Sequence, residues 1–423
     1  MSFLEKIKRN SFLRKSIAFL AHLVFGFPAR NLIVIGVTGT TGKTTTCFMI
    51  KSILESNGIK TGLISTAGFD IGPETIYPKA QTPATTPDPF MLCFLLRKMK
   101  KNNVKAVVIE TSSFGLMYER VFGLKFSVAV LTNISFNHHL TIHGGMEEYV
   151  FAKLKLFQGL DKKAIAVLPK DSEYFDLFSK NTKAKVISFS SEQSSDLWFE
   201  IKESTKDKNR AIIYFKNDSF LIDLPLLGVF NLFNCLAAIG AGQFFSLSFE
   251  QIKKGLESLT YIPGRLEEIK AKQPFTIIVD KANTPAAFCG IIEFIKTLNP
   301  EKKRVVYGNF GETPREERDQ LAQIATGFFD LTIITEDDPQ ELSPQPSIDD
   351  FLDFVKKKNV NKEKYLAIPN RKEAIRKAIN LSKKGDLIAI LGRGNEKFMD
   401  YGEKTIVFDD REVTREVLKE QGY

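Results

Sequence analysis

A turn rich in glycine and threonine follows the apolar run at residues 32–35 and has the composition of a phosphate-binding site. Residues 36–46 read Gly-Val-Thr-Gly-Thr-Thr-Gly-Lys-Thr-Thr-Thr. Glycines let backbone N–H groups approach phosphate oxygens, and the positive end of a helix dipole adds to the attraction. We therefore predict that Lys43 reaches the β- and γ-phosphates of ATP and that the Thr44 hydroxyl ligates Mg²⁺. The other nucleotide contacts are expected from Gly39, Thr40, Gly42 and Thr45.

The spacing of this turn departs from the strict P-loop, because five residues separate Gly36 from Gly42. A tight turn before an ordinary helix is the alternative. It would account for the glycines but not for Gly-Lys-Thr at this place.

The composition is that of an ordinary globular protein. The 423 residues are enough for two or three domains, and 43% are apolar while 26% are charged. The net charge of +9 is spread over helical segments, so we expect no nucleic-acid partner and expect the protein to bind small anions. We also expect a monomer. The cysteines show no paired spacing, which favours reduced thiols in the cytoplasm over a zinc site.

Lysines and arginines up to Lys15 precede the apolar run at residues 17–25, which is too short to cross a bilayer. We interpret residues 1–30 as an amphipathic helix that packs on the next domain or lies on the inner membrane surface. A cleaved signal peptide and a membrane anchor are the alternatives.

Short apolar runs alternate with amphipathic stretches through the rest of the chain, which predicts an α/β fold. Residues 31–262 are expected to form a central P-loop-type ATPase domain with a mostly parallel sheet, and residues 263–423 a smaller Rossmann-like α/β domain. Residues 336–348 are rich in Asp, Pro and Ser and predict a loop. The central strands are expected at 32–35, 61–65, 106–109, 127–131 and 164–168, the helices at 44–56, 89–101, 146–158 and 231–245, and a hairpin at 210–224. The later strands are expected at 276–279, 304–307, 331–335 and 387–391.

The phosphate turn and five further motifs resemble those of the Mur ligases, nearest to the muramoyl-tripeptide synthetases, and the resemblance runs in order from residue 31 to 423. It implies that ATP drives amide formation, through an acyl phosphate, between an amino acid and a UDP-muramoyl-peptide-like acceptor. These synthetases carry a longer UDP-binding segment before the phosphate strand than the 30 residues found here. We therefore expect that the UDP group is held differently or that the acceptor is not a UDP-muramoyl peptide.

The resemblance also implies a second metal site. Glu110 would hold a second Mg²⁺, although a neighbour of a helix cap is its structural alternative. The loop at residues 133–138 resembles Asn-x-x-x-Asp-His, with Asn137 in place of Asp. Its metal-binding histidine corresponds to His138, and His139 is the alternative.

The helix at residues 146–158 is similar to the one that carries a carbamylated lysine in the family. The match assigns that carbamate to Lys153, with Lys155 as a minor candidate and an ordinary surface lysine as the alternative. Lys43, Glu110, His138 and Lys153 are therefore the implied catalytic group. The implied residues for the acceptor are Thr85, Thr86, Ser112 and Arg120.

Three residues resemble the family's contacts to the rest of ATP. Asn234 corresponds to the residue that meets adenine, and an Asn N-cap that opens the helix at residues 231–245 is the structural alternative. Arg265 and Asp280 match contributions of the C-terminal domain.

The amino-acid pocket is less conventional. The motif Asp-Asp-Pro-Gln from Asp337 to Gln340 stands where Asp-Asn-Pro-Arg is usual, and the usual arginine reads the distal carboxylate of diaminopimelate. Because Gln340 is neutral, we predict L-lysine or a similar diamine rather than diaminopimelate, unless Arg393 or Arg371 supplies the charge. The implied pocket residues are Asp337, Asp338, Gln340, Gly392 and Glu396.

Two other functions remain open from the sequence. A folylpolyglutamate- or polyglutamate-type ligase would share the fold. A non-catalytic partner protein would explain the His and Asp positions that differ from the family pattern.

Overall fold

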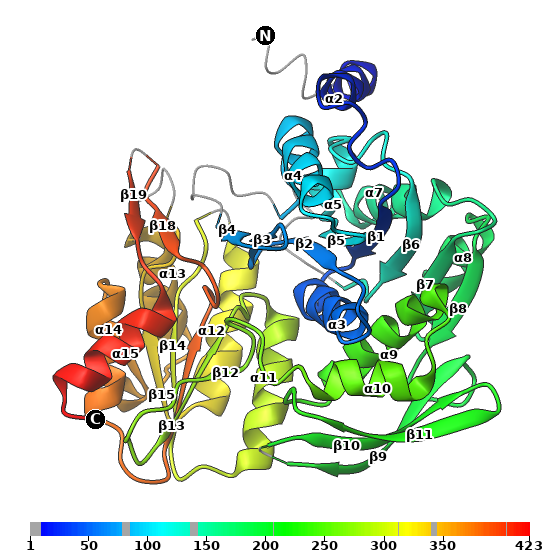
Figure 1. Cartoon of the computed structure of the whole chain (residues 1–423). Helices are drawn as coiled ribbons and strands as arrows, with labels where there is room; N and C mark the ends of the chain where they lie inside the picture. Colours follow the sequence, from blue (N-terminus) through cyan, green and yellow to red (C-terminus); the bar gives the residue numbers. More distant parts are fainter. Residues whose placement is uncertain are drawn as a thin grey trace. The chain divides into compact units, whose positions relative to one another are not determined.

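The computed structural model of the chain describes residues 10–77, 85–135, 143–205, 207–311, 313–339, 345–402 and 404–423. The chain divides into two compact units, a first that extends to Thr260 and a second from Tyr261 to Tyr423 (Figure 1). Each unit is built on its own sheet.

The first unit contains an 11-stranded sheet in the order β11-β10-β9-β8-β7-β6-β1-β5-β2-β3-β4. The strands from β9 to β2 in this order pair in parallel, and both edges are antiparallel. The sheet is therefore mixed and mostly parallel, which confirms the predicted fold class. The bounds are β1 (Ile33–Thr38), β2 (Thr61–Ser65), β3 (Gly68–Asp70), β4 (Thr75–Ile76), β5 (Ala106–Glu110), β6 (Phe126–Leu131), β7 (Ile165–Pro169), β8 (Lys185–Phe189), β9 (Leu197–Ser204), β10 (Asn209–Phe215) and β11 (Asp218–Leu224).

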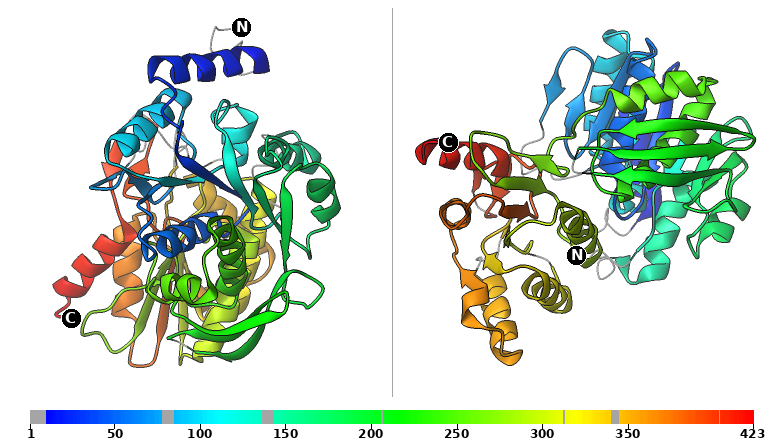
Figure 2. Two further views of the ribbon diagram at one scale, coloured as in Figure 1. Left: turned by 45° about the vertical axis from the view of Figure 1, so that its right-hand side comes forward. Right: turned by 90° about the horizontal axis from the view of Figure 1, so that it is seen from below.

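Helices cover both faces of this sheet because its central strands are buried and apolar on both sides (Figure 2). One group comprises α3 (Lys43–Glu55), α9 (Phe230–Gly242) and α10 (Phe249–Glu257), which pack on one another. The other face carries α4 (Pro89–Lys101), α5 (Ser113–Met117), α7 (Met146–Gln158) and α8 (Phe175–Lys180). The helix α2 (Ser11–Val24) lies on α4.

Strand β1 lies between β5 and β6, and all three run in the same direction. Their carboxyl ends therefore meet at one edge of the sheet, which is the usual ligand-binding edge of such folds. The residues that follow them, Gly39, Thr111 and Thr132, begin the loops of the candidate site.

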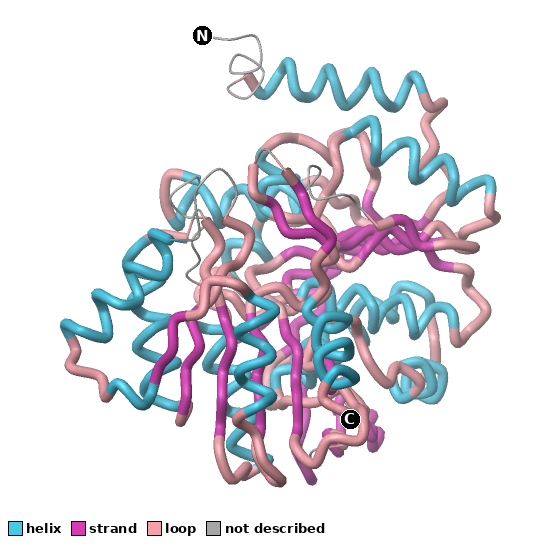
Figure 3. The backbone as a smooth tube through the Cα atoms, turned by 90° about the vertical axis from the view of Figure 1, so that its left-hand side faces the viewer, coloured by secondary structure: helices cyan, strands magenta, loops and turns pink. Residues whose placement is uncertain are grey.

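The second unit has a six-stranded sheet in the order β12-β13-β17-β14-β15-β16, flanked by helices, and a separate pair β18-β19 (Figure 3). The strands are β12 (Glu267–Glu268), β13 (Thr276–Asp280), β14 (Lys303–Tyr307), β15 (Leu331–Ile334), β16 (Tyr365–Ala367), β17 (Leu387–Leu391), β18 (Phe398–Asp400) and β19 (Thr405–Val407). The helices are α11 (Pro285–Leu298), α12 (Arg315–Phe328), α13 (Gln345–Lys357), α14 (Arg371–Asn380) and α15 (Asp410–Glu420).

The loop predicted for residues 336–348 is wrong in its last part, because α13 begins at Gln345. Ile348 and Phe351 are buried one helical turn apart and stabilise the helix against the rest of the unit. Two of the residues that indicated a loop, Pro346 and Ser347, occupy its first turn, where they are tolerated. Across the described residues, no helix combines the length and apolar character needed to span a bilayer.

Candidate active site

The phosphate turn joins β1 to α3 and needs glycine at two positions. Gly39 and Gly42 have φ values of +150° and +77°, which other residues rarely adopt. A Cβ atom on Gly42 would lie 2.2 Å from Asn234 Oδ1, so the turn and the start of α9 approach closely. Lys43 Nζ donates hydrogen bonds to the carbonyl oxygens of Gly39 (3.1 Å) and Thr40 (2.9 Å). The lysine charge is thus held directly at the turn.

A single carboxylate oxygen gathers the polar groups beside this turn. Glu110 Oε2 accepts hydrogen bonds from Thr44 Oγ1 (3.0 Å), Thr66 N (3.1 Å) and Thr66 Oγ1 (3.1 Å). Glu110 is 2% exposed and ends β5, next to the strand that leads into the turn. Hydroxyl and carboxylate oxygens are the ligands that Mg²⁺ prefers, so the side chains present fit a magnesium ion.

Lys153 projects from α7 to the same turn. It is 1% exposed, its Nζ donates to the carbonyl oxygen of Gly39 (2.9 Å), and it lies 4.1 Å from the centroid of the Tyr149 ring. Burial holds the pKa of the Lys153 amine well below its usual value, and the charge of Lys43 lowers it further. A neutral amine is the form that reacts with carbon dioxide, so this environment suits a carbamate. Lys155 instead points outward and pairs with Glu119 at 2.7 Å.

The two candidate metal-binding histidines, His138 and His139, lie outside the described residues. His143 is described and buried: its Nε2 lies 3.0 Å from Ser113 Oγ, and its ring stacks on Phe114 with centroids 4.9 Å apart. Burial lowers the pKa of His143 to about 4, so it is neutral at pH 7.

The acceptor residues implied by the family come together around Thr86, which is fully buried. Its hydroxyl donates to the carbonyl oxygen of Glu110 (2.9 Å) and accepts from the N–H of Ser112 (2.8 Å). Arg120 Nη1 donates to the carbonyl oxygen of Thr86 at 2.8 Å. Thr85 precedes this network and is half-buried. The network links the acceptor residues to the backbone of Glu110, the residue whose carboxylate accepts from Thr44.

Asn234 lies on α9, with its amide donating to Asn231 Oδ1 at 2.9 Å. Its oxygen accepts from Thr46 Oγ1 at 3.4 Å, one residue after the buried Thr45 in the first turn of α3. The Asn N-cap considered for this helix is not formed, because α9 begins at Phe230 with Val229 at the N-cap position.

In the second unit, Asp280 is the last residue of β13, and its side chain contacts the backbone directly after Arg265. Its carboxylate accepts from the N–H groups of Leu266 and Ala282, each at 2.7 Å. Burial raises the pKa of Asp280, and the nearby Arg265 charge opposes that rise.

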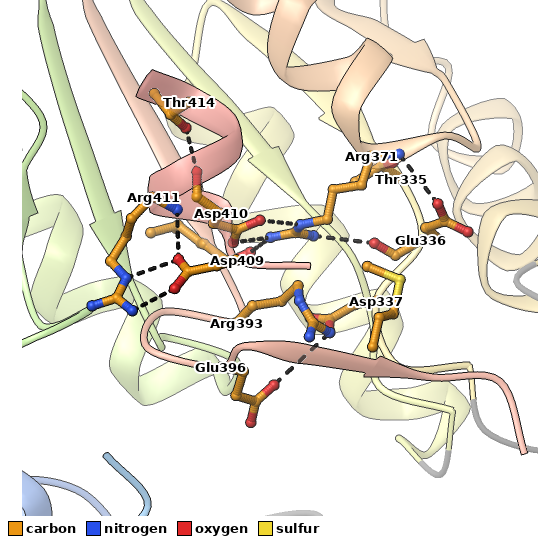
Figure 4. A network of polar contacts seen from close by, with 12 residues as sticks. Thr335, Glu336, Asp337, Arg371, Arg393, Glu396, Asp409, Asp410, Arg411 and Thr414 are labelled. Carbon is orange, nitrogen blue, oxygen red and sulfur yellow. Dashed lines mark hydrogen bonds and ion pairs between the residues drawn. The ribbon is translucent and has the colours of Figure 1, made fainter. Parts of the chain in front are cut away.

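Acidic residues of the implied amino-acid pocket surround Arg393 (Figure 4). Arg393 is fully buried, and its Nη1 donates to Asp337 Oδ1 and Asp338 Oδ1, both at 2.9 Å. Glu396 Oε2 lies 3.9 Å from the same nitrogen, and its other oxygen accepts from Lys281. Burial raises the pKa of Asp337 to about 6. A Cβ atom on Gly392 (φ +113°) would meet Asp337 Oδ2 at 2.4 Å, so only glycine fits there.

Neither arginine proposed as a substitute for Gln340 is available as an unpaired charge. Arg393 is bound by two aspartates, and Arg371 donates to both oxygens of Asp410 at 2.7 and 2.8 Å. Gln340 itself lies outside the described residues. Either arginine would have to share its charge with these carboxylates to supply the one that Gln340 lacks.

The Arg371–Asp410 pair is completely buried and predicts a large stability effect. Asp410→Ala should destabilise the second unit by about 3–5 kcal/mol, because it leaves an unpaired guanidinium in the interior. The control is Glu373→Ala on α14, the helix that carries Arg371. It removes a partly exposed partner of Arg376 and should lower the stability by about 1 kcal/mol or less. Urea-dependent hydrogen exchange in β17 measures both. Equal losses for the two variants would contradict the role assigned to the buried pair.

Sequence reasoning missed two residues of the first site. Thr66 shares the Glu110 oxygen, and the Tyr149 hydroxyl lies 3.1 Å from Thr40 Oγ1. Thr66 follows β2, a neighbour of β5 in the sheet, so its place at a strand end was a usable signal. Nothing in the sequence marks Tyr149 as facing the turn.

Comparison with known proteins gives the family. A model described as the Mur ligase middle domain matches residues 37–242, and one described as the Mur ligase glutamate ligase domain matches residues 264–394. The UDP-N-acetylmuramoyl-L-alanyl-D-glutamate–2,6-diaminopimelate ligase of Halalkalibacterium halodurans is 36% identical over 411 residues, covering 96% of this chain and 82% of the relative.

Solved structures of such ligases have the same fold as this chain. A structure of a ligase with that same name superimposes with a TM-score of 0.65 at 26% identity, over 97% of this chain and 84% of the other. The folylpolyglutamate synthase of Mycobacterium tuberculosis gives 0.70 at 17% identity, over 89% and 92%, and so shares the fold. The protein belongs to the Mur ligase family, the ATP-dependent acid–amino-acid ligases of peptidoglycan synthesis.

Proposed function

We propose that this ligase adds a 2,6-diamino acid to a UDP-muramoyl-L-alanyl-D-glutamate-type acceptor through an acyl phosphate. The observation that carries the proposal is the arrangement at the phosphate turn. One carboxylate oxygen of Glu110 accepts hydrogen bonds from Thr44 and Thr66, and Lys153 donates to the carbonyl oxygen of Gly39. The names of relatives at 32–36% identity supply the acceptor and the class of amino acid.

The first step is transfer of the γ-phosphoryl group of ATP. A carboxylate oxygen of the acceptor attacks the γ-phosphorus, the bond to the β-phosphate oxygen breaks, and ADP leaves. Lys43 holds the phosphate oxygens in line for this attack, and catalysis is mostly positioning and charge neutralisation. Magnesium held by Thr44, and a second ion held by Glu110, His138 and a carbamate on Lys153, would neutralise the phosphate charge.

The second step forms the amide. The amine of the incoming amino acid attacks the acyl carbon, and phosphate leaves with one oxygen that came from the carboxylate. Thr86, Ser112 and Arg120 form one hydrogen-bonded group next to Glu110, which suits them to hold the acceptor. Asn234, Arg265 and Asp280 would bind the adenosine part of ATP. The free amine must be unprotonated to attack.

The identity of the diamino acid is a further part of the proposal. The relatives are named for 2,6-diaminopimelate, whereas the residues described here favour L-lysine. Asp337 and Asp338 share the single charge of Arg393, and Glu396 pairs with Lys281, so three carboxylates face two cations and a second carboxylate on the substrate would lack a matched cation. The excess negative charge suits an ammonium group.

We expect a higher kcat/KM for L-lysine than for meso-diaminopimelate in direct competition. Gln340→Arg should shift the preference towards diaminopimelate by about tenfold or more, because a bidentate pair replaces a neutral contact. Gln340→Asn is the matched control and should change little. A wild-type preference for diaminopimelate would overturn this assignment and leave the ligase reaction standing.

The reaction itself is tested by incubating the protein with ATP, Mg²⁺ and a panel of acceptors and amino acids and weighing the products. The proposal predicts the mass of acceptor plus diamino acid minus water, with one ADP formed per product. A product only with a folate or polyglutamate acceptor would refute the acceptor class. ADP formation with no acceptor dependence would refute the ligase mechanism.

A further inference from the structure

The helix α2 presents an apolar face to solvent, although its opposite face is anchored to the first unit. Ala18 and Ala21 are fully buried, and His22 Nε2 lies 3.0 Å from the carbonyl oxygen of Phe122. Arg14 Nη1 donates to the carbonyl oxygen of Met117 at 2.7 Å. The inner face therefore fixes the helix, and the outer face is left for another contact.

The outer face is almost free of polar groups. Its residues recur with the spacing of one helix face, and Ser16 is the only polar member. Phe12 is 79% exposed and Val24 is 57% exposed. The apolar members are Phe12, Phe19, Leu20, Leu23 and Val24.

The first half of α4 extends this face. Phe25 of the α2 end and Phe94 of α4 meet edge to face with ring centroids 6.3 Å apart, and the two helices lie side by side (Figures 1 and 2). Phe90, Met91 and Phe94 are each more than one-third exposed. We call the exposed residues of α2 and α4 together the α2–α4 face. It gathers eight exposed apolar side chains on two adjoining helices, whereas exposed apolar residues that need no explanation occur singly.

Cations predominate around the α2–α4 face, and the acidic residue beside its Phe90 is the exposed Asp88, which caps α4. Residues 11–30 contain three cations and residues 89–105 contain five, and neither range contains Asp or Glu. The outward positions that follow Phe94 on α4 are cationic, and Lys98 Nζ lies 5.0 Å from the Phe94 ring centroid. The eight cations are Arg14, Lys15, Arg30, Arg97, Lys98, Lys100, Lys101 and Lys105.

We propose that the α2–α4 face binds the surface of an anionic lipid bilayer, with α2 lying in the interface plane. Exposed aromatic and aliphatic side chains flanked by lysine and arginine are the chemistry of interfacial helices, in which apolar burial and attraction to anionic headgroups act together. A second copy of this chain fits less well, because a twofold contact would set these cations against the same cations. The proposal is independent of the ligase reaction.

The test is flotation of the full chain with vesicles of phosphatidylcholine alone and with 30% phosphatidylglycerol. We expect binding to the anionic vesicles that weakens as salt is added. Phe19→Ser/Leu23→Ser and Arg97→Gln/Lys98→Gln/Lys101→Gln should each weaken it by about tenfold or more, from the loss of apolar area or of charge near the surface. Equal binding to both vesicle types, or none to either, would overturn the proposal.

Matched controls lie on the same unit. Ile201→Ser/Leu221→Ser removes two exposed apolar residues of β9 and β11, and Lys162→Gln/Lys163→Gln/Lys183→Gln removes three exposed cations. Both should bind like the wild type. If they weaken binding as much as the α2–α4 variants, the face has no special role. A dimer in sedimentation velocity that only the α2 variant abolishes would assign the face to a second copy and overturn the bilayer.

A fluorescence measurement reports on α2 directly. The chain has a single tryptophan, Trp198, so Trp198→Phe/Phe19→Trp places the only indole on the outer face of α2. We expect a blue shift with anionic vesicles and none with neutral ones. A protein that floats with anionic vesicles without this shift would bind through another surface, which would refute the proposal.

Discussion

Replacing Lys43 with alanine is expected to lower substrate-dependent phosphate release by a factor of about 10³ or more, with the fold intact. The lysine ammonium is held at the turn by the carbonyl oxygens of Gly39 and Thr40. Its loss removes charge that stabilises the transferred phosphoryl group, whereas its side chain contributes little to the core. Initial rates of phosphate release, measured beside circular dichroism of the variant, check this.

Lys51→Ala is the matched control for that variant. Lys51 lies on the same helix but pairs with Glu55 and Asp70 on the outside of the unit. It should retain the wild-type rate. A folded Lys43→Ala protein with undiminished turnover would show that the phosphate site lies elsewhere.

Lys153→Ala is expected to lose activity by about 10²-fold or more and to recover part of it with added short carboxylates. The carbamate would replace a cation by an anion, which makes binding of a metal ion favourable at this place. In the wild type, ¹³C-bicarbonate should give a carbamate resonance. That resonance should be absent in Lys153→Ala and unchanged in Lys155→Ala, whose side chain pairs with Glu119 at the surface.

The carbamate also predicts a pH dependence. Burial and Lys43 lower the pKa of Lys153, so its amine is neutral above that lowered pKa and protonated below it. Wild-type activity that depends on the carbamate formed from bicarbonate should therefore fall as the pH falls through this pKa. Loss of the resonance in Lys155→Ala rather than Lys153→Ala would show that the wrong lysine was chosen.

Much of the fold could be predicted because its parallel strands are continuous apolar runs. The predicted strand at 61–65 and helices at 89–101 and 146–158 have the bounds of β2, α4 and α7. The strands β8 and β9 were missed, because Lys185 and Glu200 interrupt their apolar pattern at exposed positions. The helix α13 was missed because the Asp, Pro and Ser residues of this segment predicted a loop, although one face of the helix is apolar and buried.

The candidate site was predictable where a motif marks it and unpredictable where only packing does. Lys43 and Thr44 follow from the glycine turn itself. Thr66 and Tyr149 join the site through strand order and side-chain direction, which the sequence does not display. The pairing of Arg393 with two aspartates likewise depends on β14 lying between β17 and β15 in the sheet.

Transfer of oxygen from the acceptor to phosphate tests the central claim most directly. The protein would be incubated with ATP, the diamino acid and an acceptor whose reacting carboxylate carries ¹⁸O in both positions, and the released phosphate would be weighed. If an acyl phosphate forms, each phosphate carries one ¹⁸O atom and the amide keeps the other. Amide product accompanied by unlabelled phosphate would contradict activation of the carboxylate by phosphoryl transfer.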